Sequence, residues 1–176
     1  MSTRTVLHEA DISRALTRIA HEILESNRGA EDLVLLGIPT RGVTLAERLA
    51  ALIEGIAQQP IARGALDITL FRDDLARHPT RSPHPTEIPA GGIDGRTVVL
   101  VDDVLFSGRS IRSALDAIQS IGRPAVVRLA ILIDRGHREL PIRPDFVGKN
   151  IPSARAERVN VRLFEHDGAE EVTIEA

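Results

Sequence analysis

The sequence predicts a single α/β domain over residues 1–176, with a central parallel sheet and helices on both of its faces. Three strongly apolar runs favour this fold, because each is short and lacks the alternation of a sheet with one solvated face; they are 33–38, 98–101 and 125–133. The first two runs lead through a polar turn into apolar residues at helical spacing, which is typical of βα units. A chain of 176 residues is long enough to bury roughly 70% of its unfolded surface.

Composition limits the classes of function. Charged residues make up 27% and hydrophobic residues 43% of the chain, as expected for a soluble globular protein. Cysteine is absent, so disulfides and thiolate metal sites are excluded. No apolar run approaches the ~20 residues that span a bilayer, and we therefore expect a cytoplasmic protein with no membrane partner. The net charge of -3 gives no overall nucleic-acid footprint, so RNA binding would need a local basic face.

The first helix is predicted over 11–26, with Asp11 as its N-cap and a stop at 27–29. Its apolar residues form one stripe at helical spacing. The opposite face is polar and collects Arg14, Thr17, Arg18 and His21. On physical grounds alone, this face is best interpreted as a solvated surface with weak i,i+4 pairs such as Arg18 with Glu22.

The run 33–38 is predicted as a central strand, and a helix follows from about 43 to 57. Between them lie Thr40, Arg41 and Gly42. A polar loop at a helix N-terminus suits an anion, because unpaired N–H groups and the helix macrodipole both point toward it. An ordinary βα turn has the same composition, so the loop alone leaves both interpretations open.

Residues 66–72 are predicted as a strand, because polar and apolar residues alternate loosely there. From 73 to 96, prolines and glycines interrupt every pattern. A loop of this length in a compact domain is typical of a functional element, and we expect a lid over about 73–96.

The segment 98–111 combines a buried strand, an acidic pair and a small polar loop that opens a helix. We expect the strand to end at Asp102 and Asp103, because neighbours in a longer strand would point to opposite faces. Gly108 allows close backbone approach, and the helix N-terminus can hold a phosphate. Carboxylates just upstream can accept hydrogen bonds from vicinal hydroxyls, so the segment suits a ribose 5-phosphate. An acidic pair that only ends a strand is the simpler alternative.

The rest of the chain supplies the remaining strands. Residues 125–133 are predicted as another buried strand, and 134–152 as a charged loop followed by a short strand. The segments 159–164 and 172–174 are predicted as closing edge strands. Walker A loops are excluded, because the single lysine, Lys149, is followed by Asn150.

The segment 98–111 resembles the signature for phosphoribosyl diphosphate (PRPP) in the type I phosphoribosyltransferases. Its spelling is most similar to that of the PyrR family, bacterial pyrimidine operon regulators that are also uracil phosphoribosyltransferases. Phe106 and Ser107 stand where that family commonly has Tyr and Thr, a mild departure. The resemblance extends over 14–152, and the stretch 134–152 is its most family-specific part.

The resemblance implies roles for particular residues. Those that would bind PRPP are Thr40, Arg41, Gly42, Arg72, Asp102, Asp103, Val104, Leu105, Phe106, Ser107, Gly108, Arg109 and Ser110, with Asp102, Asp103 and Arg41 also catalytic. A small antiparallel hood over about 134–155 would select the base through Arg135, a stacking Phe146 and the backbone of Val147. The implied RNA-binding residues are Arg14, Thr17, Arg18, His21, His137 and Arg138. A cis peptide bond, common in this superfamily, would fall between Thr40 and Arg41.

The resemblance also implies a reaction and partners. Phosphoribosyl would pass from PRPP to uracil, giving UMP and diphosphate, with Mg²⁺ carried by PRPP rather than by dedicated protein ligands. Further partners would be UMP or UTP, pyrimidine operon mRNA, and other copies of the chain in a homo-oligomer. Two alternatives stay open: an RNA-binding attenuation regulator with vestigial catalysis, and a purine salvage phosphoribosyltransferase.

Overall fold

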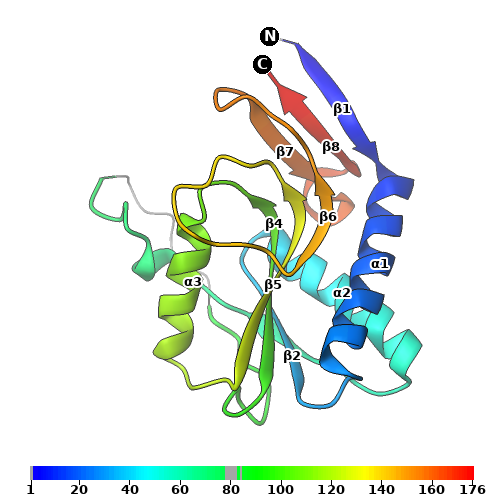
Figure 1. Ribbon diagram of the computed structural model, residues 1–176, viewed down its shortest axis with the longest axis vertical. Helices are drawn as coiled ribbons and strands as arrows, with labels where there is room; N and C mark the ends of the chain where they lie inside the picture. The colour runs from blue at the N-terminus through cyan, green and yellow to red at the C-terminus, as the bar shows by residue number, and fades with distance from the viewer. Residues whose placement is uncertain (1, 78–82, 84) are drawn as a thin grey trace.

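The chain forms two sheets in the computed structural model, which describes residues 2–77, 83 and 85–176 (Figure 1). The five-stranded sheet is parallel, with the order β3-β2-β4-β5-β6. Its strands are β2 (Leu33–Gly37), β3 (Ala62–Ala65), β4 (Thr97–Leu105), β5 (Val126–Asp134) and β6 (Phe146–Asn150). The three-stranded sheet is antiparallel, with the order β1-β8-β7. Its strands are β1 (Thr3–His8), β7 (Arg158–Arg162) and β8 (Glu171–Glu175).

Helices cover both faces of the parallel sheet, as the sequence predicts. The helices are α1 (Glu9–Asn27), α2 (Arg41–Ala57), α3 (Arg109–Gln119), the short α4 (Phe164–Asp167) and the 3₁₀ turn η1 (Thr69–Phe71). In Figure 1, α1 and α2 lie on one side of the sheet and α3 on the other. Each side has its own apolar core, one built on α1 and α2 and the other on α3. None of the helices in the described part of the chain combines the length and apolarity that crossing a membrane requires.

Helix α1 starts two residues before the predicted helix. Asp11 lies in its first turn rather than at the N-cap, and its carboxylate accepts a hydrogen bond from the N–H of His8, the N-cap residue, at 2.9 Å. Asp11 thus still stabilises the helix start, by the reciprocal contact of a capping box.

The strand predicted over 66–72 is wrong. The strand beside β2 is β3, and residues 69–71 form the 3₁₀ turn η1. Gly64 explains why the strand lies at 62–65. The backbone of Glu87 approaches Gly64 so closely that a Cβ on residue 64 would collide with the carbonyl oxygen of Glu87. Ala65 and Glu87 exchange backbone hydrogen bonds of 2.8 and 2.9 Å, so this short stretch is held by backbone pairing on both sides.

Strand β4 is longer than expected. It continues past the acidic pair to Leu105, and Val104 and Leu105 are paired with Ile133 and Asp134 of β5. The acidic residues therefore do not end the strand. Apolar residues on both sides of the pair, together with the long partner strand β5, explain the extension.

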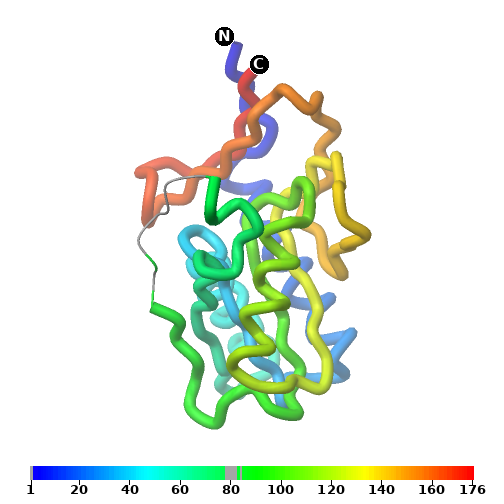
Figure 2. Tube along the Cα trace, turned by 90° about the vertical axis from the view of Figure 1, so that its left-hand side faces the viewer, coloured from blue at the N-terminus to red at the C-terminus, as the bar shows by residue number. Residues whose placement is uncertain are grey.

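The antiparallel sheet is formed by other residues than the segment 134–155 that was expected to form the hood. Residues 146–150 form β6, an edge strand of the parallel sheet, rather than an antiparallel element. The antiparallel sheet is formed instead by β7 and β8, which the sequence predicts as strands, and by β1, which it does not. Figure 2 shows this small sheet standing at one end of the molecule, beyond the main body.

Part of the segment expected as a lid, 78–82 and 84, lies outside the described residues. The end of that segment is anchored, because Glu87 bridges to Ala65 and Ile93 is buried in the core on the α3 side.

Candidate active site

A cavity of about 710 Å³ lies between the parallel sheet and the antiparallel sheet. Three elements of the main body reach it through Arg41 at the start of α2, Asp103 on β4 and Asp167 on α4. The antiparallel sheet contributes polar side chains of both signs, among them Thr5, Arg158, Asn160, Arg162, Glu171 and Thr173. The position agrees with the general rule that ligands of parallel sheets bind beyond the carboxyl ends of the strands.

The loop before α2 packs directly on β4. Gly42 is buried, and a Cβ on it would lie 2.5 Å from the carbonyl oxygen of Val101. Only glycine lets the helix start approach the strand so closely, which brings Arg41 to the cavity where Asp103 lies. The cis peptide bond of this loop joins Pro39 to Thr40, one bond earlier than expected.

The acidic pair is split by the continuing strand. Asp103 lines the cavity, whereas Asp102 lies beside Gly42 at the contact between β4 and α2. Each carboxylate accepts a hydrogen bond from the next backbone N–H: Asp102 from Asp103 at 2.9 Å and Asp103 from Val104 at 2.8 Å. Burial raises the pKa of Asp102 well above its usual range, and the charge of Asp103 raises it further.

The loop that opens α3 has the geometry of an anion site. Gly108 is the N-cap residue with φ of +92°, a conformation that favours glycine. Ser107, just before the helix, accepts a hydrogen bond from the N–H of Arg109 at 3.3 Å. The guanidinium of Arg109 pairs with Asp73 at 2.7 Å and Glu139 at 3.1 Å, so it ties this loop to two neighbouring segments. Ser110 is exposed in the first turn of the helix.

The segment after β5 folds over this loop. Arg135 is buried and its guanidinium carbon lies 4.2 Å from the ring centroid of Phe106. It donates to Ser153 Oγ at 3.2 Å and to the carbonyl of Ala154 at 2.9 Å. His137 contacts the same ring edge-on, with centroids 5.9 Å apart. Phe106 and Arg135 thus form one stacked unit beside the loop.

Phe146 does not have the arrangement expected of a base-stacking residue. It is 5% exposed and packs in the core formed with α1 and α2. The reason is the alternation of β6, whose first residue faces the core because the strand pairs with β5. The carbonyl of Val147 accepts a hydrogen bond from Arg18 Nη1 at 3.0 Å.

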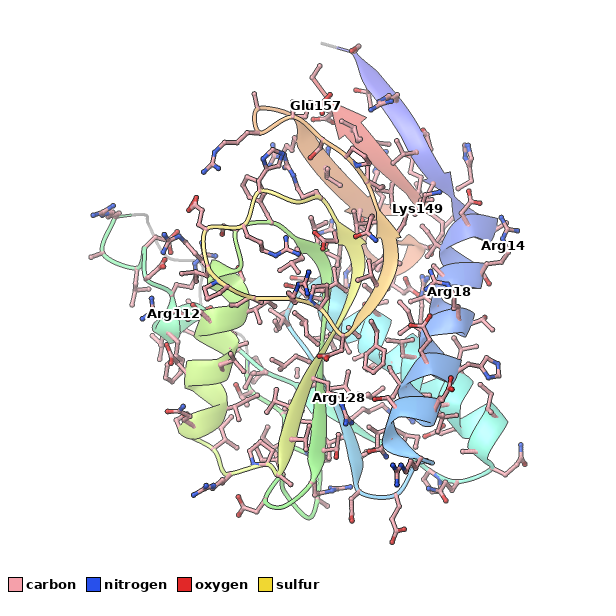
Figure 3. All side chains as sticks on the ribbon, in the orientation of Figure 1. Arg14, Arg18, Arg112, Arg128, Lys149 and Glu157 are labelled. Atoms are coloured by element: carbon pink, nitrogen blue, oxygen red, sulfur yellow. The ribbon has the colours of Figure 1, made fainter. Side chains whose placement is uncertain are left out.

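The residues expected to contact RNA fall into two groups. Arg14, Thr17, Arg18 and His21 share the exposed face of α1, where Arg14 and Arg18 line a cavity of about 310 Å³ together with Lys149 of β6 (Figure 3). His137 and Arg138 lie elsewhere and are engaged internally. His137 Nε2 is 2.6 Å from the carbonyl oxygen of Ser153, and Arg138 donates to the carbonyl of Phe106 at 3.0 Å.

Of the residues predicted to bind PRPP, Arg41 and Asp103 line the large cavity and the others do not, and Asp167 and Lys149 are among the site residues that were not predicted. Arg72 pairs with Asp74 at 2.8 Å and is not among the residues that line the large cavity. Asp167 reaches the cavity from a helix of four residues, too short for a periodic sequence signal. Lys149 joins the basic face of α1 through the pairing of β6 with β5, which only the tertiary structure reveals.

Comparisons with known proteins agree with this geometry. The family model described as phosphoribosyl transferase domain matches residues 2–165. A relative from Leifsonia xyli subsp. xyli named bifunctional protein PyrR is 66% identical, covering 99% of this chain and 98% of the relative. A protein of the same name from Streptomyces coelicolor is 62% identical, covering 98% and 90%.

Solved structures support the fold. A hypoxanthine-guanine phosphoribosyltransferase from Bacillus anthracis has a TM-score of 0.71 at 15% identity, covering 100% of both chains. A hypoxanthine phosphoribosyl transferase from Trypanosoma cruzi has a TM-score of 0.73 at 16% identity, covering 98% of this chain and 91% of the other. The family match and the relatives, each spanning nearly the whole chain, together show that the chain belongs to the phosphoribosyltransferases and, among them, to the PyrR family.

Proposed function

We propose that this protein transfers phosphoribosyl from PRPP to uracil, giving UMP and diphosphate. The observation that carries the proposal is one cavity shared by Arg41 and Asp103, which come from two separate βα units of the parallel sheet. A cation to hold diphosphate and a carboxylate to hold ribose hydroxyls are the two groups that the reaction needs in one place. The high identity to proteins named PyrR supports the same reaction.

In the proposed reaction, N1 of uracil forms a bond to C1′ of ribose while the bond from C1′ to the diphosphate oxygen breaks, and the N1 proton passes to the departing diphosphate or to water. The sugar carbon becomes cationic and the diphosphate gains charge. Arg41 stabilises the departing diphosphate, and the carboxylate of Asp103 orients the ribose and stabilises the positive charge on it. The N–H groups at the start of α3, with Ser107 and Ser110, hold the 5′-phosphate. No side chain has to act as a nucleophile.

We propose that Mg²⁺ enters this site as a partner of PRPP. Within the described residues, no cluster of three or more acidic or histidine side chains forms a metal site. Asp103, which lines the cavity, would be the carboxylate of the acidic pair that is available to the ion, with most ligands coming from diphosphate and water, as Mg²⁺ prefers. When bound, the ion neutralises charge on the diphosphate.

The base would be selected by the segment that follows β5. Arg135, stacked on Phe106 and fixed by Ser153 and Ala154, offers a rigid wall beside the loop that holds the phosphoribosyl group. Roles for Phe146 and Val147 would require β6 to expose groups that now face the core or Arg18. The purine salvage alternative is disfavoured by the identity to PyrR proteins, since the likeness to purine enzymes supports only the fold.

A second function, nucleotide-dependent binding of pyrimidine operon mRNA, is favoured by the face of α1. Arg14 and Arg18 flank a cavity with Lys149, and Thr17 and His21 lie on the same exposed helix face. Such a local cluster of cations can hold phosphates although the chain as a whole is acidic. UMP or UTP in the active site would regulate this binding. If the protein binds RNA but hardly forms UMP, it is the alternative named above, an attenuation regulator with vestigial catalysis.

Assembly of copies of the chain forms part of the proposal. Leu70 and Phe71 on η1 are 67% and 38% exposed, and Leu115 on α3 is 38% exposed. Because η1 and α3 are in contact, these side chains are candidates for one apolar patch, and contiguous exposed apolar patches mark interaction surfaces. Light scattering after size exclusion would measure the mass, and a monomer at micromolar concentration would contradict the assembly.

The test of the reaction is product formation from PRPP with uracil, hypoxanthine or guanine, with and without Mg²⁺. We expect UMP from uracil only, and only with Mg²⁺. Purine nucleotide formation would establish the salvage alternative instead. Absence of product from every base, in a folded protein that binds UMP, would leave the RNA-binding regulator as the function.

A further inference from the structure

The guanidinium of Arg41 is already bound to a carboxylate of this chain. Arg41 donates from Nε to Asp167 Oδ2 at 3.1 Å and from Nη2 to Oδ1 at 2.6 Å, a two-point ion pair. The Asp167 side chain is only 16% exposed, and Arg41 holds the pKa of this carboxyl below its usual range. Both residues line the large cavity together with Asp103. The cation assigned to diphosphate is therefore neutralised from within.

Asp167 is fixed in this position by its neighbours. Its Oδ2 also accepts the N–H of Leu163 at 2.9 Å, at the start of α4. Two further residues of α2 fasten the same segment: Thr44 Oγ1 lies 2.6 Å from His166 Nε2, and Arg48 pairs with Glu165 and Glu170. Positions 41, 44 and 48 follow one another along a single helix face. The segment 164–170 thus holds a carboxylate against Arg41 by contacts that do not involve Arg41 itself.

A diphosphate and Asp167 would compete for the same guanidinium. The two-point pair uses one edge of the planar fork, the geometry that also binds phosphate oxygens best. A carboxylate at this place also repels a ligand with several negative charges in a site partly shielded from solvent. Both effects lower the affinity of the site for diphosphate.

We propose that Asp167 is an internal competitor of diphosphate for Arg41, which weakens the binding of diphosphate and of the diphosphate group of PRPP. The inference rests on the proposed function, because it takes Arg41 as the diphosphate ligand. In the reaction, diphosphate arrival breaks the pair, and the return of Asp167 to Arg41 displaces the product. Asp167 thereby sets the affinity of the site without touching the reacting atoms.

The test is calorimetric titration of the full chain with magnesium diphosphate, for the parent, Asp167→Asn and a control. Asparagine keeps an oxygen for the Leu163 N–H but removes the charge, and we expect diphosphate to bind about fivefold more tightly, the change that loss of a partly exposed ion pair can give. The KM for PRPP is expected to fall by a similar factor. Asp167→Ser, which also retains an acceptor, serves if the asparagine variant folds poorly.

Glu165→Gln is the matched control, because it neutralises a carboxylate on the same short helix whose partner, Arg48, lies outside the lining of the cavity. Its diphosphate affinity should equal that of the parent. Equal tightening in both variants would show that loosening of α4, and not competition, is responsible. Unchanged or weaker binding in Asp167→Asn would overturn the proposal, since Asp167 would then position Arg41 for its ligand.

The outcome also separates the two proposals. A parent that forms UMP while Asp167→Asn leaves the diphosphate affinity unchanged would refute the competition and keep the proposed function. A parent that neither forms UMP nor binds magnesium diphosphate would refute the proposed function, and the competition with it.

Discussion

Replacing Arg18 tests whether a residue expected to bind RNA also holds the fold together. Its guanidinium donates to the carbonyl oxygens of Val147 and Gly148 on β6 and to Glu22. Because β6 is an edge strand that pairs only with β5 in the described part of the sheet, these bonds fasten it to α1 as well. A hydrogen bond from a charged donor contributes about 1.5–3 kcal/mol, and half exposure of this side chain reduces that. We expect Arg18→Ala to lower the free energy of unfolding by about 1–2 kcal/mol.

The matched control is Arg14→Ala. Arg14 lies one turn earlier, is 72% exposed and pairs with Asp11 of its own helix, so its loss should change stability by less than ~0.5 kcal/mol. Urea titration measures both variants, with equal m-values required for the comparison. A variant Arg18→Ala as stable as Arg14→Ala would refute the idea that Arg18 fastens β6.

RNA titrations test a second role of Arg14 and Arg18, contact with phosphates, independently of their effect on stability. If both arginines contact phosphates, each substitution should reduce the salt dependence of RNA binding by about one ion. Titrations with a pyrimidine operon leader RNA at several salt concentrations measure this slope. Equal binding by the parent and both variants across salt would remove the α1 face from the RNA site.

Three further predictions concern the acidic pair and its neighbour. Asp103→Asn should lower UMP formation at least ~10-fold with an unchanged urea midpoint, and near-normal turnover would contradict its assigned role. Burial raises the pKa of Asp102 above the ordinary value of about 3.9, so the folded state binds this proton more tightly than the unfolded state does. The free energy of unfolding therefore falls as the pH rises from about 3.9 through the raised pKa. The stability of Asp102→Asn relative to the parent should therefore increase from acidic to neutral pH, and a pH-independent difference in urea titrations would refute this. Gly42→Ala should cost about 1–3 kcal/mol in the same assay, because its Cβ would lie 2.5 Å from Val101 O; parental stability would show that the loop can move away.

The central strands could be predicted from sequence, whereas the edge strands β3 and β1 could not. Strands β2, β4 and β5 are buried on both faces, so their apolar runs stand out. Strand β3 consists of small residues and one arginine, and its pairing depends on the backbone of Glu87 approaching Gly64. Strand β1 is polar and mostly exposed, and it exists because β8 pairs with it. Such contacts between distant parts of the chain leave no local pattern.

The same division applies to the site. Arg41 follows a strand in a recognisable loop, Asp103 belongs to an acidic pair that follows an apolar run, and the structure brings them to one cavity. The partner of Arg41 is Asp167, 126 positions away, which no spacing rule connects to it. Phe146 was expected at the base because of family resemblance, but strand alternation turns it into the core. Tertiary pairing, rather than residue type, determines which of these side chains are available to a ligand.

The antiparallel sheet has a consequence for how the molecule is made on the ribosome. Its middle strand, β8, follows every other strand in the chain, yet it must pair with β1, as in the contact between Thr5 and Glu171 across 166 positions. Pairing across such a distance is slow, and the earlier parts of a chain fold first during synthesis. The parallel sheet can therefore form on a nascent chain before β8 is available to pair with β1. The antiparallel sheet forms the side of the cavity opposite Arg41 and Asp103, and it is complete only after β8 has been synthesised. The full binding cavity for PRPP therefore forms only at that point.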